Sequence, residues 1–215
     1  MHALFSEEEF ERIKYLLLVY EWGHRTLMTK LNIIREDLIS AGNTSIENIH
    51  GRMKAPASIA GKLSKMNAPL DAENAKLHLK DIAGIRIICP FSRDIHYIIG
   101  LLRQMPEVKI LDEKDYITHP KPSGYRSYHV IMEVPIFYSS KTEHIPVEVQ
   151  LRTQAMDFWA TLEHKARYKY KDHIPQHLSD ELVACAEKIA MLDDRMFTIH
   201  EIITLINEDG SGPPD

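Results

Sequence analysis

The apolar positions near the start of the chain recur every three or four residues. Within residues 6–41 they are Phe10, Ile13, Leu17, Tyr20, Leu27, Leu31, Ile34 and Leu38. This spacing predicts one long helix with a single apolar stripe. His24 falls within the stripe, and we interpret it as a core or interface histidine and not as a ligand.

A basic segment follows this helix. Pro56 suits the first turn of a second helix, in which Ser58 and Lys62 lie one turn apart on the same face. Arg52 and Lys54 precede the helix, where free backbone N–H groups favour an anion. These residues therefore indicate a phosphate-binding cluster. The alternative is a solvated basic helix face.

Strand-like patterns occupy the middle of the chain. After a short helix near residues 72–79, the β-branched run at residues 81–90 predicts a buried strand. The chain then continues with a helix at 92–105, a strand at 108–117 and an antiparallel pair at 126–138 and 143–152. Strands between helices predict an α+β fold with a mixed sheet of about four to five strands, flanked by helices that include long N- and C-terminal ones.

The last of these strands carries two kinds of side chain in strict alternation. The apolar set points one way and the polar set the other; the sets are Val147, Val149 and Leu151, and Glu148, Gln150 and Arg152. Burying a carboxylate, an amide and a guanidinium in a row is costly unless they contact a polar ligand or one another. This polar face is therefore predicted to form the floor of a site.

A second carboxylate is placed at the start of a strand. Asp81 and Glu148 are of the type that holds Mg²⁺, which takes oxygen ligands, and a metal among basic groups suits phosphoryl transfer. The alternative is a pair of structural salt bridges. Asp81 and Arg86 would lie on opposite faces of a regular strand. For both to serve one site, Asp81 must precede the strand or Gly84 must mark a bulge.

Two helices end the chain. Residues 153–170 form the first, and the second has a heptad seam of Leu182, Cys185, Ile189, Leu192, Met196, Ile199, Ile203 and Ile206. A heptad seam needs a partner helix. The partner could be the N-terminal helix of the same chain or that of another subunit, and we expect both in an oligomer.

Length, charge and missing motifs narrow the function. At 215 residues, 44% of them hydrophobic and 27% charged, the chain is expected to form one soluble domain. The net charge of −5 argues against a general attraction to nucleic acid or membrane. Two cysteines, an acidic N-terminus without a signal peptide and no membrane-length apolar run predict a cytoplasmic protein. P-loop, dinucleotide-binding and zinc motifs are absent from the sequence.

Six motifs, taken together, closely resemble the synthetase domain of the RelA/SpoT family. In chain order they are Gly51-Arg-x-Lys-x-x-x-Ser-x-x-x-Lys62, Asp81-Ile-Ala-Gly-x-Arg86, Lys114-Asp-Tyr, Lys121-Pro-Ser-Gly-Tyr-Arg-Ser-Tyr-His129, Glu148-Val-Gln-x-Arg-Thr153 and Phe158-Trp-Ala-x-x-Glu-His164. The resemblance covers about residues 45–172. With only helices flanking that core, the chain resembles a small alarmone synthetase.

The resemblance implies a nucleotidyltransferase-like fold and a Mg²⁺-dependent GTP/GDP diphosphokinase. Such an enzyme transfers the β,γ-pyrophosphate of ATP to the ribose 3′-hydroxyl of GTP or GDP and releases AMP. On the ATP side, the resemblance implies that Arg52 and Arg86 sandwich adenine and that Lys54, Ser58 and Lys62 hold the phosphates. Catalysis and metal binding would fall to Asp81 and Glu148, with Glu148 as a metal ligand or as the base. On the acceptor side, Tyr125 would stack on guanine, and the nucleotide would also contact Lys114, Lys121, His129 and Gln150.

Departures from the family pattern leave some properties open. Ser123 and Asp157 stand where many or some relatives have Asn, so the guanine contacts and the choice between GTP and GDP are undecided. No His-Asp dipeptide of the family's hydrolase domain occurs, and ribosome sensing is not expected.

Residues 1–215 are predicted to be a single synthetase domain that forms a homotetramer through helices 6–41 and 177–207. Regulation by pppGpp or RNA stays open.

Two other functions compete with this interpretation. One is a different nucleotidyltransferase-fold enzyme, which would release pyrophosphate. The other is a non-catalytic nucleotide- or RNA-binding module on the same scaffold.

Overall fold

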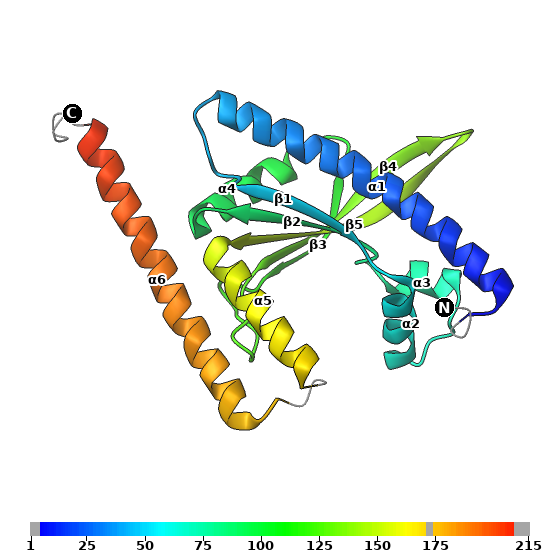
Figure 1. Ribbon diagram of the computed structural model, residues 1–215. Helices are drawn as coiled ribbons and strands as arrows, with labels where there is room; N and C mark the ends of the chain where they lie inside the picture. Colours follow the sequence, from blue (N-terminus) through cyan, green and yellow to red (C-terminus); the bar gives the residue numbers. More distant parts are fainter. Residues whose placement is uncertain (1–4, 171–173, 209–215) are drawn as a thin grey trace.

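The computed structural model describes residues 5–170 and 174–208. A central sheet lies between helices, and long helices stand at both ends of the chain (Figure 1). The elements in chain order are α1 (Glu7–Ser40), β1 (Asn48–Met53), α2 (Pro56–Lys65), α3 (Ala72–His78), β2 (Ala83–Cys89), α4 (Ser92–Arg103), β3 (Lys109–Asp115), β4 (Tyr128–Tyr138), β5 (Lys141–Thr153), α5 (Gln154–Lys169) and α6 (Gln176–Glu208).

In the described residues the sheet has five strands in the order β1-β2-β5-β4-β3. Only the β2–β5 pair is parallel, and the other neighbours are antiparallel. The mixed α+β fold is therefore confirmed. The sequence pattern gave no signal for β1, because this edge strand contains few apolar residues and is largely exposed.

One face of the sheet carries the apolar core. It is covered by α1, which crosses the strands (Figure 1), and by α4. Ile13, Tyr20, Leu27 and Leu31 of α1 are fully buried, as the predicted stripe requires, and the alternate residues of β5 face them. Each large apolar side chain buried in this way stabilises the fold by about 1.5–3 kcal/mol.

The contact between α1 and β1 is especially close. A Cβ atom at Gly51 would lie only 2.3 Å from Nε2 of His24. Only glycine fits at this position while His24 keeps its place, because real Cβ atoms do not approach other atoms so closely. The predicted role of His24 as a core histidine agrees with this packing.

The opposite face of the sheet is polar, and α5 lies beside it at one end (Figure 1). Within the chain, the described part of α6 packs against α5. The expectation that α6 would contact the N-terminal helix of the same chain is therefore wrong, since α1 covers the other face of the sheet. The later seam residues Leu192, Met196, Ile199 and Ile203 are exposed.

A turn between the two layers depends on a second glycine. Gly124 has φ of +86°, a conformation that side chains rarely adopt, and an added Cβ would lie 2.7 Å from Cβ of Ala186 on α6. The neighbouring Tyr125 packs on a small apolar cluster of Trp159, Ala160 and Ala186. The segment that carries Tyr125 is thus fixed by α5 and α6.

Among the described residues, no helix is long and apolar enough to cross a lipid bilayer. Cys89 is buried, Cys185 is exposed, and both are free thiols.

Candidate active site

Two adjoining cavities open on the polar face of the sheet. The first, here called the Lys114 cavity, has a volume of about 810 Å³ and is lined by Lys114, Tyr116, Lys121 and His129 among others. The second, the Arg86 cavity, has about 490 Å³ and is lined by residues that include Arg52, Arg86 and Arg152. Both cavities share the residues Asp81, Tyr125, Glu148, Gln150 and Glu163. The two predicted carboxylates thus lie where the cavities meet.

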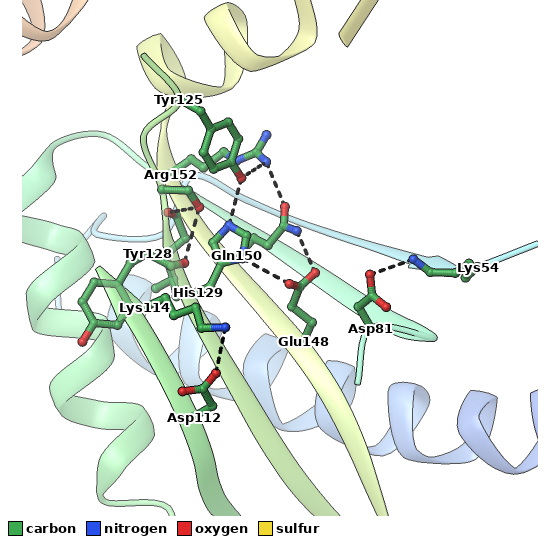
Figure 2. Close-up of polar contacts among 12 residues, drawn as sticks. Lys54, Asp81, Asp112, Lys114, Tyr125, Tyr128, His129, Glu148, Gln150 and Arg152 are labelled. Carbon is green, nitrogen blue, oxygen red and sulfur yellow. Dashed lines mark hydrogen bonds and ion pairs between the residues drawn. The ribbon is translucent and has the colours of Figure 1, made fainter. Parts of the chain in front are cut away.

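Glu148 is held from two sides. Its Oε1 lies 3.1 Å from Nδ1 of His129, and its Oε2 accepts a hydrogen bond of 2.7 Å from Nε2 of Gln150 (Figure 2). Burial raises the pKa of Glu148, but the bonds from His129 and Gln150 lower it further than burial raises it, so the net pKa lies below the ordinary value. The carboxylate is therefore ionised at neutral pH, and Nδ1 of His129 must carry the proton that it accepts.

These contacts belong to a closed ring of hydrogen bonds. Nη2 of Arg152 donates to Oε1 of Gln150 at 2.9 Å and to Oη of Tyr125 at 2.7 Å. The Tyr125 hydroxyl is in turn 2.9 Å from Nε2 of His129 (Figure 2). Every member of the ring Glu148, His129, Tyr125, Arg152 and Gln150 therefore has two partners. A closed network of this kind restricts the motion of its side chains.

Asp81 precedes β2, as the sequence required if Asp81 and Arg86 were to share a site. Its Oδ2 accepts from Nζ of Lys54 at 2.7 Å and also from Nζ of Lys62. Burial raises the pKa of Asp81, but the two ammonium groups lower it further, so that the net shift is downward. Burial likewise lowers the pKa of Lys54, although Asp81 partly offsets this. Lys54 and Lys62 are thus paired with a carboxylate and are not simply free cations beside a helix N-terminus.

The wall of the Lys114 cavity combines aromatic rings with cations. Nζ of Lys121 lies 4.5 Å from the ring centroid of Tyr116 and 5.0 Å from that of Tyr125. The rings of Tyr116 and His129 meet edge to face with centroids 5.3 Å apart. Lys114 pairs with Asp112 at 3.2 Å (Figure 2). Flat rings and mobile ammonium groups suit a nucleobase with phosphates.

The structure does not bring every predicted residue to the cavities. Arg52 and Arg86 line the Arg86 cavity, from the neighbouring strands β1 and β2. Lys54 lines neither cavity and reaches the site only through Asp81. Ser58 is exposed on α2 outside both cavities, and its role in phosphate binding stays a prediction.

Several site residues were not assigned a role from the sequence. Arg152 joins the hydrogen-bond ring, Asp157 accepts from Arg152, Glu163 lines both cavities, and Tyr116 lies against Lys121. The strand alternation had placed Arg152 on the polar face, and Tyr116 and Glu163 fall within the quoted motifs. Spacing could not give the contact between Arg152 and Tyr125, because the two residues are 27 positions apart in the sequence.

Two carboxylates and the phosphates of a nucleotide could together hold a metal ion. Within the part of the chain that the structure describes, no group of three or more metal-ligating side chains is found. Asp81 and Glu148 nevertheless both lie where the two cavities meet. Two carboxylates at this junction fit an ion that takes most of its ligands from substrate and water.

Two cavities that meet at a pair of carboxylates, with lysines around them, suit an enzyme that transfers a phosphoryl group between two bound substrates. The family described as "Region found in RelA / SpoT proteins" matches residues 51–173. The chain belongs to the RelA/SpoT family. This match covers the strands and helices that build both cavities.

Individual relatives agree with this assignment. The Bacillus subtilis (strain 168) protein named GTP pyrophosphokinase YwaC is 42% identical over 184 residues, which are 85% of this chain and 88% of that protein. The crystal structure of small alarmone synthetase 1 from Bacillus subtilis bound to its product pppGpp is 35% identical, with a TM-score of 0.84, and covers 90% of this chain and 98% of that one. The same relative bound to AMPCPP is 31% identical, with a TM-score of 0.77, over 90% and 98% of the two chains.

Proposed function

We propose that the protein is a (p)ppGpp synthetase that transfers the β,γ-pyrophosphate of ATP to the ribose 3′-hydroxyl of GTP or GDP and releases AMP. The observation that carries this proposal is the pair of cavities that meet at Asp81 and Glu148. One cavity offers guanidinium groups for a base, and the other offers aromatic rings and lysines. The structures of one relative with pppGpp and with AMPCPP support the binding of such nucleotides, and we assign one nucleotide to each cavity.

ATP is assigned to the Arg86 cavity. The guanidinium planes of Arg52 and Arg86 stack on adenine from adjacent strands. Its phosphates extend toward Asp81, where Lys54 and Lys62 exchange part of their contact with the carboxylate for contact with phosphate oxygens. Ser58 and the N-terminus of α2, which has no side-chain cap, are assigned to the outer phosphate.

The acceptor nucleotide is assigned to the Lys114 cavity. Tyr125 stacks on guanine, while Lys114, Lys121 and His129 surround the ribose and phosphates. Gln150 lies between both nucleotides and holds Glu148. Positioning of this kind supplies most of the rate acceleration in phosphoryl transfer.

Glu148 is the general base. Its ionised carboxylate accepts the proton of the 3′-hydroxyl as that oxygen forms a bond to the β-phosphorus of ATP. The bond between the β-phosphorus and the bridging oxygen to the α-phosphate breaks, and AMP leaves with that oxygen. Asp81 and Glu148 would hold Mg²⁺, which when bound neutralises charge on the phosphates.

The organisation around this site forms part of the proposal. Residues 1–215 act as one synthetase domain, with the catalytic core at 45–172, and synthesis occurs without hydrolysis. Helices 6–41 and 177–207 build a homotetramer, for which the exposed apolar residues of α6 provide a surface. The free thiols favour a reducing compartment, in agreement with a cytoplasmic enzyme of the stringent response.

The test is to incubate the purified protein with Mg²⁺, ATP and either GTP or GDP and to separate the nucleotides by chromatography. We expect AMP together with a guanine nucleotide that has gained a 3′-pyrophosphate. Release of pyrophosphate would instead indicate nucleotidyl transfer, and unchanged nucleotides would indicate a binding module. Comparison of the two acceptors gives the GTP or GDP preference.

A further inference from the structure

The carboxylate of Asp157 lies between two guanidinium groups of the site. Its Oδ1 forms an ion pair with Nη1 of Arg86 at 3.0 Å and accepts a hydrogen bond of 3.0 Å from Nη1 of Arg152. Asp157 occupies the first turn of α5, and this helix begins at the N-cap residue Thr153, whose hydroxyl accepts from the backbone N–H of Met156. One carboxylate oxygen on α5 therefore contacts two strands, since Arg86 lies on β2 and Arg152 on β5.

The two arginines need this shared partner. Arg152 is only 5% exposed. Burial and the nearby charge of Arg152 both lower the pKa of Arg86, while the charge of Asp157 opposes that shift. Two like charges in a partly buried site repel each other strongly, and a carboxylate between them offsets the repulsion. Without Asp157, no single carboxylate would hold the two guanidinium groups in their present orientation.

Both arginines line the cavity assigned to ATP, but only Arg152 also contacts residues that the two cavities share. Through its other nitrogen, Arg152 holds the hydroxyl of Tyr125, whose ring lines both cavities, and the amide of Gln150, which in turn holds Glu148. A continuous series of hydrogen bonds and ion pairs thus runs from Arg86 through Asp157 and Arg152 to the base.

We propose that Asp157 is a positioning residue that couples the two nucleotide sites, so that binding of ATP and binding of the acceptor strengthen each other. The proposal rests on the proposed function, because it assumes one nucleotide in each cavity. Stacking of adenine fixes the plane of the Arg86 guanidinium, and Asp157 passes this constraint to Arg152 and hence to Tyr125. A tyrosine held in place binds a base with less loss of conformational freedom. Linkage requires the effect to be reciprocal.

The experiment measures binding and not turnover. The dissociation constant of a non-hydrolysable ATP analogue is determined by titration calorimetry on the full chain with Mg²⁺, in the absence and in the presence of saturating GDP. For the wild type we expect the analogue to bind at least about fivefold more tightly with GDP, the lower end of typical coupling between sites. For Asp157→Ala we expect the ratio to fall close to one.

Replacing Asp157 by asparagine should give an intermediate degree of coupling between the two nucleotides. In Asp157→Asn the side-chain oxygen can still accept from Arg152, but the negative charge that pairs with Arg86 is lost, so the ratio should lie between those of the wild type and the alanine variant. Asp180→Asn is the matched control, because Asp180 is an exposed carboxylate on α6 that bonds only to Gln176 among the contacts described. Its ratio should equal that of the wild type.

The outcomes separate this inference from the proposed function. An unchanged ratio in Asp157→Ala would overturn the coupling role, even if the melting temperature fell, because a purely structural ion pair affects stability alone. If the alanine variant does not fold, Asp157→Ser replaces it, since a serine hydroxyl is too short to bridge both arginines. A wild type that binds both nucleotides independently contradicts only the coupling. A wild type that binds neither contradicts the proposed function itself.

Discussion

Glu148 combines an ionised carboxylate with a fixed orientation, and both come from its neighbours His129 and Gln150. Replacement by Gln keeps the size of the side chain but removes the group that accepts the proton. We expect Glu148→Gln to lower kcat by about 100-fold or more, the usual contribution of a general base. The affinity for the ATP analogue should change little, which calorimetry can measure alongside the product assay.

A carboxylate outside the site serves as the control for this variant. Glu133 lies on the neighbouring strand β4, lines neither cavity and contacts His144. Glu133→Gln should keep the wild-type kcat. Full activity in Glu148→Gln would remove Glu148 from the mechanism.

Tyr125 has two separable features, its ring and its hydroxyl. Tyr125→Ala removes both and should weaken the guanine nucleotide by about 5- to 150-fold, because stacking on an aromatic ring contributes about 1–3 kcal/mol. Tyr125→Phe keeps the ring but loses the bonds to Arg152 and His129, so it should keep most of the acceptor affinity while kcat falls. Calorimetry with each nucleotide separates these effects. An equal loss of ATP and acceptor affinity in Tyr125→Ala would contradict the stacking role.

At the scale of single residues, the sequence predicted which side chains face the site but not what they contact. Strand alternation placed Glu148, Gln150 and Arg152 on one face because a strand repeats every two residues. The contacts of Lys54 and Lys62 with Asp81 join residues from separate elements. No local pattern records such contacts, since they depend on how the helices pack.

Among the connections between elements, the turn at Gly124 is the one most closely tied to the site. Gly124→Ala forces a side chain into a positive φ and against Ala186. The strain should destabilise the protein by about 1–3 kcal/mol. It should also displace Tyr125 and so weaken the acceptor nucleotide more than ATP. Urea unfolding and calorimetry measure the two effects.

A second substitution tests whether the contact with Ala186 causes the destabilisation of Gly124→Ala. Ala186→Gly removes the atom that the new Cβ would meet, although by itself it costs about 1 kcal/mol in a helix. The double variant Gly124→Ala with Ala186→Gly should therefore be more stable than the sum of the two single effects predicts. Simple additivity would show that the contact with α6 does not constrain the turn.

The elements with a strong apolar period were predicted well, and the exception is informative. The stripe of α1 and the alternation of β5 both arise because one side of each element is buried. A regular spacing of apolar residues in the sequence indicates such a buried side. β1 lies at the sheet edge and is held by its backbone pairing with β2. Its side chains are mostly exposed, so its sequence carries no apolar period from which a strand could be predicted.

At the scale of the whole molecule, α6 carries an exposed apolar surface. The helix packs on α5, and its Phe197 and His200 contact the ring of Phe91, whereas Leu192, Met196, Ile199 and Ile203 are exposed. Ile199→Glu places a charge in the middle of this surface and should split the proposed oligomer, because a buried charge without a partner is costly. Light scattering coupled to size-exclusion chromatography gives the mass.

Thr198→Glu is the control, since it adds the same charge beside the seam on the same helix. That variant should keep the mass of the wild type. If Ile199→Glu also keeps the wild-type mass, the heptad seam of α6 is not the oligomer interface.

The close packing of His24 against Gly51 restricts which substitutions this protein can accept during evolution. Position 51 directly precedes Arg52, so a larger residue there would meet the His24 ring, and either that ring or the edge strand, which carries a wall of the Arg86 cavity, must shift. A smaller residue at position 24 removes this conflict. A library in which both codons vary should therefore return larger residues at 51 mainly together with small residues at 24.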